Sequence, residues 1–240
     1  MVTLAEILTK LRRYYGRDAA PRLPSDPFEL VLWENVAYLA DDEKRRNAFD
    51  LLRSSVGTSP EKILAAKPAA LLAVTRHGIL PARFAEKLKT SARIARDKFG
   101  GNLTEVVRRS VNEAKRALRK FPGIGEPGAE KILLFSGQHA FLAPDSNALR
   151  VLVRLGFLPD DSNYSRTYNA SRKLADVHLP ARVDRRMEAH QLLRHHGQTL
   201  CRRTRPLCRE CPLEKLCPSA KAFLAAAAEN SPRAKSRNSE

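Results

Sequence analysis

The sequence predicts an all-α fold, and three observations support this expectation. Apolar residues recur at spacings of three and four along most of the chain, which is the period of an amphipathic helix. Residues that cap helix N-termini, often followed by proline or glutamate, precede several of these runs. No stretch of useful length alternates apolar and polar residues as a half-buried strand does, and no internal repeat is found.

The first two helices are defined by their caps. Thr3 and Glu6 form a capping box at the start of the first helix. One face of that helix carries Leu4, Ile7, Leu8 and Leu11. A link rich in proline and aspartate follows at 18–27, and the run Asp-Pro-Phe-Glu at 26–29 then supplies a cap, a first-turn proline and an N3 glutamate. The helix that begins there is expected to run to about Leu39.

Five further helices are expected before the first glycine-rich hairpin. They lie near 42–55, 60–66, 68–76, 81–98 and 104–120. Ser59-Pro60 and Leu80-Pro81 mark helix starts, and Gly100-Gly101 marks a stop. The last of these helices has an apolar face, and its other positions carry Arg108, Arg109, Lys115, Arg116, Arg119 and Lys120. A charged face of this kind is usually just solvated, so its meaning depends on the motifs beside it in the chain.

The chain ends in a basic tail at 223–240 that is expected to be largely disordered. Its alanine-rich beginning, 222–228, is compatible with a short helix. The last dozen residues carry little apolar surface to bury, and their positive charge would add weak affinity for DNA.

Composition favours a partner with negative charge. The 240 residues include 43 Lys and Arg against 26 Asp and Glu, so the net charge is +17, which points most simply to nucleic acid. A generally basic surface is the alternative. No apolar run is long enough to cross a membrane, and the N-terminus lacks the features of a secretory signal. We therefore expect a cytoplasmic, DNA-associated protein, and because nothing specifies an oligomer, a monomer.

All four cysteines lie in one short stretch near the C-terminus. Cys201, Cys208, Cys211 and Cys217 are spaced C-x6-C-x2-C-x5-C. Four thiolates so close together can hold one soft metal centre. An iron–sulfur cluster fits this spacing better than structural zinc, whose usual pattern has two CxxC knuckles and a longer gap. Two disulfides are the third possibility, and they are disfavoured because nothing else in the chain indicates secretion.

A glycine-rich turn joins two predicted helices at residues 121–125. In Phe-Pro-Gly-Ile-Gly, the glycines Gly123 and Gly125 flank Ile124 just before a helix N-terminus. Several backbone N–H groups are then expected to point in one direction, which makes a binding site for an anion. Arg119 and Lys120 precede the turn, so a DNA phosphate is the expected anion. An ordinary helix–helix turn is the alternative.

These motifs together resemble the endonuclease III superfamily of DNA glycosylases. The cysteine spacing is that of the family's iron–sulfur loop, and residues 121–156 look like its helix-hairpin-helix followed by a Gly/Pro-rich loop and an aspartate. Residues 28–42 resemble an early helix of the family. The resemblance covers roughly 22–217 and implies a two-lobed fold with a 4Fe-4S cluster.

The lobes that the resemblance implies have approximate bounds. A six-helix barrel would span 22–139 and contain the hairpin at about 118–137. A lobe around the cluster would combine 1–21 with 140–222. Arg202, Arg203 and Arg205 of the cysteine loop would hold DNA phosphates together with the hairpin.

The resemblance also assigns chemistry to individual residues. Asp145 stands at the place of the family's catalytic aspartate, although it would also serve as a simple N-cap. Bifunctional members carry a lysine two residues after the last glycine of the hairpin, and here that residue is Pro127. Without this amine, the reaction must use water. Lys131, one turn later, is a less favoured substitute.

Glu34 corresponds to the glutamate with which adenine-specific members protonate the leaving base. Burial beside an apolar stripe would raise its pKa toward the range of a general acid. Asn35 or Glu29 would replace it if the register slipped, and a glutamate that merely faces solvent is the remaining alternative. Leu39 stands where relatives have a glutamine and would wedge into the base stack, with Tyr38 nearby.

The function that we expect is a monofunctional DNA glycosylase of base excision repair. Its partner would be double-stranded DNA with a lesion or mismatch, and the base that it removes is not specified. Two alternatives are a DNA-structure-binding protein with reduced catalysis and a bifunctional glycosylase/AP lyase that uses an unrecognised amine.

Overall fold

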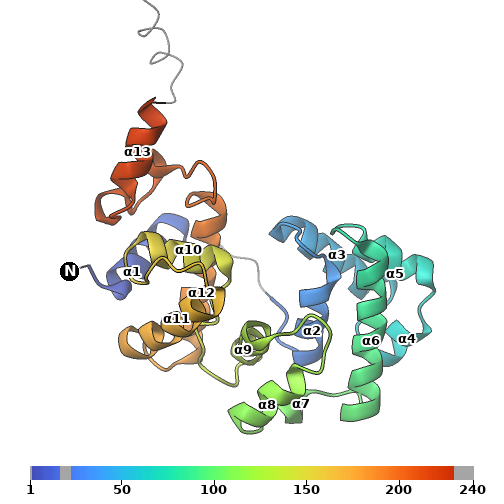
Figure 1. The fold of residues 1–240 in the computed structure, drawn as a ribbon. Coiled ribbons are helices and arrows are strands. Elements are labelled where there is room, and N and C mark those ends of the chain that lie inside the picture. Colours follow the sequence, from blue (N-terminus) through green and yellow to red (C-terminus); the bar gives the residue numbers. More distant parts are fainter. Residues whose placement is uncertain (1, 17–22, 230–240) are drawn as a thin grey trace, which may run out of the picture. The chain divides into compact units, whose positions relative to one another are not determined.

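The computed structural model describes residues 2–16 and 23–229. Within these residues it contains helices and no strands, so the predicted all-α class is confirmed. The chain divides into two compact units, one formed by Met1–Ala20 with Phe141–Glu240 and the other by Pro21–Ala140 (Figure 1). The first unit brings together the two ends of the sequence.

The unit at 21–140 is built around helix α2. Its described helices are α2 (Pro27–Val36), α3 (Asp42–Ser55), α4 (Pro60–Ala65), α5 (Pro68–Thr75), α6 (Pro81–Phe99), α7 (Thr104–Val107), α8 (Val111–Leu118) and α9 (Glu126–Phe135). Helix α2 packs against α3, α6 and α9, and most of its side chains are buried. Asp26 begins it by accepting a hydrogen bond from the Glu29 backbone N–H (2.9 Å).

Helix α2 ends at Val36, three residues before the expected end at Leu39. The backbone of Gly78 lies against this point, because a Cβ on Gly78 would come within 2.4 Å of the Tyr38 nitrogen. Ile79 N–H then donates to the Tyr38 carbonyl (3.1 Å). The chain therefore leaves the helix to meet the 78–79 loop, and Leu39 adopts the left-handed conformation (φ 55°).

The prediction of one helix at 104–120 is wrong, because this segment forms the two helices α7 and α8. Between them Ser110 has an extended ψ of 147°, and its hydroxyl donates to Glu113 (2.6 Å). Val107 before the break and Ala114 after it are both buried. The apolar spacing thus continues across the interruption, and spacing alone could not show it.

The other unit has α12 at its centre. It contains α1 (Leu4–Tyr15), α10 (Ser146–Arg154), α11 (Tyr164–His178), α12 (Val183–Thr199), the 3-10 turns η1 (Cys208–Glu210) and η2 (Glu214–Leu216), and α13 (Ala220–Glu229). Helix α12 packs against both α1 and α10. The predicted capping box of α1 is confirmed, and Leu4 and Leu11 are fully buried in this unit's core.

Helices α11 and α12 have no counterpart among the helices predicted from the sequence. In α12 the buried positions include Arg186, His190 and His196, each at most 2% exposed. Polar residues inside the core obscure the apolar period by which a helix is normally recognised.

Helix α13 covers the alanine-rich beginning of the tail, and residues 230–240 lie outside the described part of the chain. Among the described helices, none is both long and apolar enough to cross a membrane.

Candidate functional site

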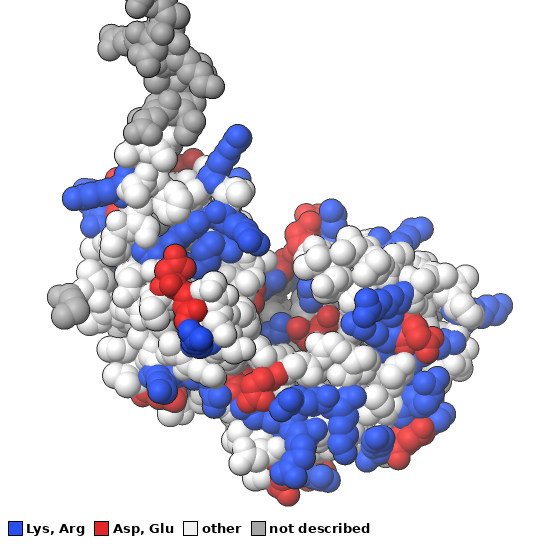
Figure 2. Space-filling model, viewed as in Figure 1, with Lys and Arg blue, Asp and Glu red and all other residues white. Residues whose placement is uncertain are grey.

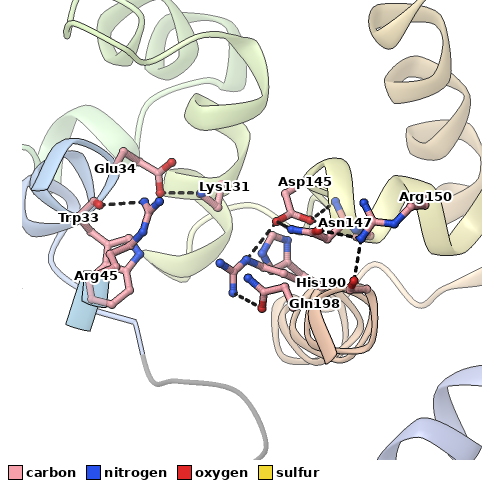
Figure 3. A network of polar contacts seen from close by, with 12 residues as sticks. Trp33, Glu34, Arg45, Lys131, Asp145, Asn147, Arg150, His190 and Gln198 are labelled. Atoms are coloured by element: carbon pink, nitrogen blue, oxygen red, sulfur yellow. Dashed lines mark hydrogen bonds and ion pairs between the residues drawn. The ribbon is translucent and has the colours of Figure 1, made fainter. Parts of the chain in front are cut away.

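Asp145 occupies the N-cap of α10, where four contacts fix its carboxylate (Figure 3). Oδ1 accepts hydrogen bonds from the backbone N–H groups of Asn147 and Ala148, both at 2.9 Å. Oδ2 accepts from Asn147 Nδ2 (3.1 Å) and forms an ion pair with Arg194 Nε (3.1 Å). The side chain stays 27% exposed, so solvent and solutes can reach the carboxylate.

The electrostatic surroundings keep Asp145 ionised. Burial alone would raise its pKa, but the Arg194 guanidinium, the Ala148 N–H and the nearby His190 together outweigh it. The pKa of Asp145 therefore lies below its ordinary value. At neutral pH the site presents a carboxylate and not a carboxylic acid.

Helix α12 supplies the groups that surround Asp145, and the sequence patterns did not identify them. Arg194 also donates to Gln198 Oε1 (3.2 Å), and His190 Nδ1 contacts the Leu142 carbonyl (3.2 Å). Gly197 permits the close approach of α12 to α10, because a Cβ there would lie 2.5 Å from the Asn147 carbonyl oxygen. The indicator in the sequence is a glycine inside a helix, which often marks close packing.

Two arginines connect α10 to the cysteine loop. Arg150 Nε donates to the Cys201 carbonyl (2.9 Å), and Arg150 Nη2 donates to the Gly197 carbonyl (2.7 Å). Arg154 Nη1 donates to Cys201 Sγ (3.3 Å) and to the Arg202 carbonyl (2.7 Å). Helix α10 thus holds Asp145 at its first end and the cysteine loop at its last.

The loop arginines expected to hold phosphates are exposed. The Arg202 guanidinium is turned back onto the chain, where Nε donates to the Thr199 carbonyl (2.7 Å). Arg203 and Arg205 are exposed, and Arg205 has a left-handed backbone (φ 53°). All three remain candidates for phosphate contacts.

All four cysteines line one pocket of the loop. The thiols are unpaired, which contradicts the disulfide alternative. Leu213 N–H and Arg154 point at Cys211 and Cys201, as donors do toward thiolate ligands. In the described residues, no three Cys, His, Asp or Glu side chains are gathered tightly enough to hold one metal ion. Thiolates around an iron–sulfur cluster stand farther apart than ligands of a single ion, so the donor set fits a cluster.

Burial disfavours the charged form of three of the four thiols. Burial raises the pKa of Cys211 to about 11, and it also raises the pKa of Cys208 and Cys217. Neighbouring thiolates raise these values further. A positively charged metal centre is the counter-charge that such a group of thiolates requires.

In the other unit, Glu34 of α2 forms an ion pair with Lys131 of α9. Glu34 Oε1 lies 2.6 Å from Lys131 Nζ, and both side chains are less than 20% exposed. The two alternatives to Glu34 are engaged elsewhere. Asn35 is buried and donates to the Val31 carbonyl (3.1 Å), and Glu29 accepts from Arg53 and Thr58 (both 2.8 Å).

The glycine-rich turn leads directly into α9. Gly123 has a φ of 79°, and Gly125 is the N-cap of α9 without a side-chain hydrogen bond. Glycine at the cap leaves the first N–H groups of the helix accessible to an anion. Pro127 lies in the first turn, and Ile124 is buried.

The arginine and lysine residues around the hairpin divide into two sets. Lys115 of α8 is buried and pairs with Glu130 (2.6 Å) and Glu126, which fastens α8 to α9. Arg119 and Lys120 are exposed, and Arg119 lies 3.7 Å from Glu126. Figure 2 shows Lys and Arg side chains gathered over the α7–α8 region.

Tyr38 and Leu39 belong to an exposed apolar patch. Leu39 is 72% exposed, and Tyr38 stacks on Phe84 with ring centroids 4.7 Å apart. Ile79 and Leu80 of the neighbouring loop are also half exposed. The sequence patterns identified Tyr38 and Leu39 but not Ile79 and Leu80. The Ile79–Tyr38 hydrogen bond brings the two pairs together in the fold.

Relatives and solved structures match almost the whole chain. Endonuclease III of Thermotoga maritima is 26% identical over 207 residues, which cover 84% of this chain and 90% of the relative. Endonuclease III of Sulfolobus acidocaldarius is 24% identical over 88% of this chain and 94% of its own length. A structure of a non-covalent endonuclease III–DNA complex matches 94% of this chain and 100% of its own with a TM-score of 0.74 at 23% identity. Over almost its whole length the chain is similar to DNA glycosylases of the endonuclease III-like helix-hairpin-helix superfamily.

Other members of the superfamily match at similar levels. A thermostable thymine-DNA glycosylase matches 91% of this chain and 97% of its own with a TM-score of 0.72 at 20% identity. No family model matches the chain.

Proposed function

We propose that this protein is a monofunctional DNA glycosylase of base excision repair, which uses water to hydrolyse the N-glycosidic bond of a flipped, damaged or mismatched base. The observation that carries the proposal is the ionised and solvent-accessible carboxylate of Asp145 at the N-terminus of α10. The presence of Pro127 where bifunctional members have their lysine supports the monofunctional form.

Asp145 is the proposed catalytic residue. As the bond from C1′ to the base nitrogen breaks, positive charge develops on the sugar, and a nearby carboxylate stabilises it. The bonding electrons leave with the base. A water oxygen then bonds to C1′, and Asp145 accepts the proton that this water loses.

Glu34 is the proposed second polar group of the reaction, and its pairing with Lys131 changes the expected role. A carboxylate 2.6 Å from an ammonium group is stabilised in its charged form. We propose that this ion pair contacts the leaving base, with Lys131 as the hydrogen-bond donor and Glu34 as the acceptor.

DNA binding is assigned to the surfaces described above. Gly123, Ile124 and Gly125 would hold a phosphate together with Arg119 and Lys120. Phosphates would also be held by the loop residues Arg202, Arg203 and Arg205. Leu39 and Tyr38 would fill the space left by the flipped base. Unpairing costs a few kcal/mol and is cheapest for weak pairs, which favours lesions.

The proposed cofactor is a 4Fe-4S cluster held by Cys201, Cys208, Cys211 and Cys217. Its role would be to fix the fold of the loop, and base removal itself contains no redox step. In this proposal the unit at 21–140 is the six-helix barrel, and the other unit is the cluster lobe. A monomer is the proposed state.

One experiment tests the proposal directly. A panel of duplexes, each with one modified or mismatched base, is incubated with wild type and Asp145→Asn, and hot alkali then cleaves at abasic sites. Cleavage that wild type produces and the variant does not is the expected result. Cleavage of no member of the panel despite tight binding would support the DNA-structure-binding alternative.

Borohydride trapping separates the monofunctional enzyme from the glycosylase/lyase alternative. Lys131 is the amine to consider, because it lies on α9 one turn beyond Pro127. A covalent adduct that Lys131→Met abolishes would establish an amine mechanism. The expected result is product without any adduct.

A further inference from the structure

A line of polar contacts connects helix α1 to one cysteine of the loop. Tyr15 Oη lies 2.8 Å from His196 Nδ1 and 3.0 Å from Thr199 Oγ1. The other ring nitrogen, His196 Nε2, lies 3.6 Å from Cys211 Sγ. His196 is 2% exposed, so its ring is shielded from solvent.

The two ring nitrogens of His196 face different groups, with Nδ1 toward Tyr15 and Nε2 toward Cys211. A neutral ring carries one N–H and one bare nitrogen, and a hydrogen bond to one nitrogen decides the state of the other. The contacts therefore allow two arrangements of the hydrogens.

In the first arrangement every donor points toward the sulfur. The Tyr15 hydroxyl donates to Nδ1 of His196, and Nε2–H then donates to Cys211 Sγ. In the second, the Cys211 thiol donates to Nε2 and Nδ1–H donates to the Tyr15 oxygen. The Tyr15 hydroxyl then donates to Thr199, whose own hydroxyl donates to the His195 carbonyl (2.9 Å).

The state of the sulfur decides between the two arrangements. A thiol can donate to a bare nitrogen, whereas a thiolate has only lone pairs and needs a donor. We infer that Tyr15 and His196 form a hydrogen-bonded arm that positions Cys211 as a ligand of the metal centre, with Nε2 of His196 facing the sulfur. This inference rests on the proposed iron–sulfur cofactor.

The arm adds a second donor to the sulfur of Cys211. Leu213 N–H reaches the same sulfur at 3.4 Å, so two N–H donors share its negative charge. Hydrogen bonds to cysteine sulfur stabilise the reduced form of a cluster and strengthen ligand binding. Tyr15 and His196 are positioning residues in this role, since neither is itself a ligand.

The test compares the full-length wild type with His196→Leu and Tyr15→Phe, all purified without oxygen. Two quantities are measured: the decay of iron–sulfur absorbance near roughly 400 nm in the presence of a ferrous chelator, and the reduction potential by voltammetry. His196→Leu is expected to release iron about 10- to 100-fold faster, as other losses of outer-shell partners do. Tyr15→Phe should have a smaller effect of the same sign, and both potentials should become more negative.

Tyr14→Phe is the matched control, because Tyr14 is half exposed and only touches the edge of Tyr15. If His196→Leu does not fold, Tyr15→Phe still decides the question, since it removes one hydroxyl and keeps the ring. Unchanged iron release and potential in an iron-loaded Tyr15→Phe would overturn the inference and leave the proposed cofactor intact. A wild type that binds no iron would overturn both.

Discussion

Arg194 Nε lies 3.1 Å from Asp145 Oδ2, and this ion pair joins α12 to the N-terminus of α10. The same carboxylate caps α10 through its other oxygen. Asp145 therefore has a structural role that can be separated from its proposed chemical one.

The first prediction separates these roles. Asp145→Ala is expected to lose about 1 kcal/mol of unfolding free energy, because the cap disappears. Asp145→Asn keeps an oxygen that accepts from Asn147 and Ala148, so its loss should be smaller. Both variants should lose base removal, which gel assays of abasic sites would measure. Full activity in Asp145→Asn would contradict the catalytic assignment.

The second prediction concerns pH. The pKa of Asp145 is below its unfolded value, so its contribution to stability is complete above the unfolded pKa and is lost as pH falls through the folded one. Arg194→Met should raise the pKa of Asp145 and move both the acid unfolding limb and the acid limb of activity to higher pH. Circular dichroism and initial rates across pH 3–7 would measure the two transitions. Transitions at the same pH in wild type and variant would show that Arg194 does not set the pKa of Asp145.

The third prediction tests the contact between α10 and α12. Gly197→Ala places a methyl group 2.5 Å from the Asn147 carbonyl oxygen, so the helices must separate, at a cost of about 1–3 kcal/mol. Gly128→Ala is the control in another helix, where the new Cβ meets Ile124 at an ordinary 3.5 Å. Urea unfolding should show a large loss for the first variant only. Equal stability of the two variants would mean that the contact is easily relaxed.

The fourth prediction concerns the hairpin. Gly123→Ala introduces a Cβ 3.0 Å from Asn35 Oδ1 at a φ of 79°, so the turn is strained. Affinity should fall by similar factors for damaged and undamaged duplexes, because phosphate contacts do not depend on sequence. Fluorescence anisotropy at several salt concentrations would measure this, and wild-type affinity should itself decrease steeply with salt. A loss restricted to damaged DNA would place the hairpin in lesion recognition instead.

Much of the fold follows from local features of the sequence. The caps at Thr3, Asp26 and Ser59 each begin a helix where expected, because capping depends on a few neighbouring residues. The early end of α2 depends on Gly78, which is distant in sequence. The break after α7 is hidden because buried valine and alanine positions continue through it.

In the candidate site, too, some residues are recognisable from the sequence and others are brought in only by the fold. Asp145, Glu34 and the cysteines stand out because their positions match known motifs. Their partners Arg194, Lys131 and His196 come from other helices, and only tertiary packing brings them into contact. The sequence around these charged and aromatic residues does not indicate which groups they contact.

Helix α10 has only nine residues, yet its two ends meet groups of very different chemical durability. A carboxylate is inert to oxidants, whereas thiolates bound to iron are among the first groups that oxidants attack. Because Arg150 and Arg154 tie the helix to that loop, oxidation of the proposed cluster would lower the proposed activity without altering Asp145 itself. A repair activity arranged in this way would decline under the very conditions that damage DNA, unless the cell rebuilt its metal centre.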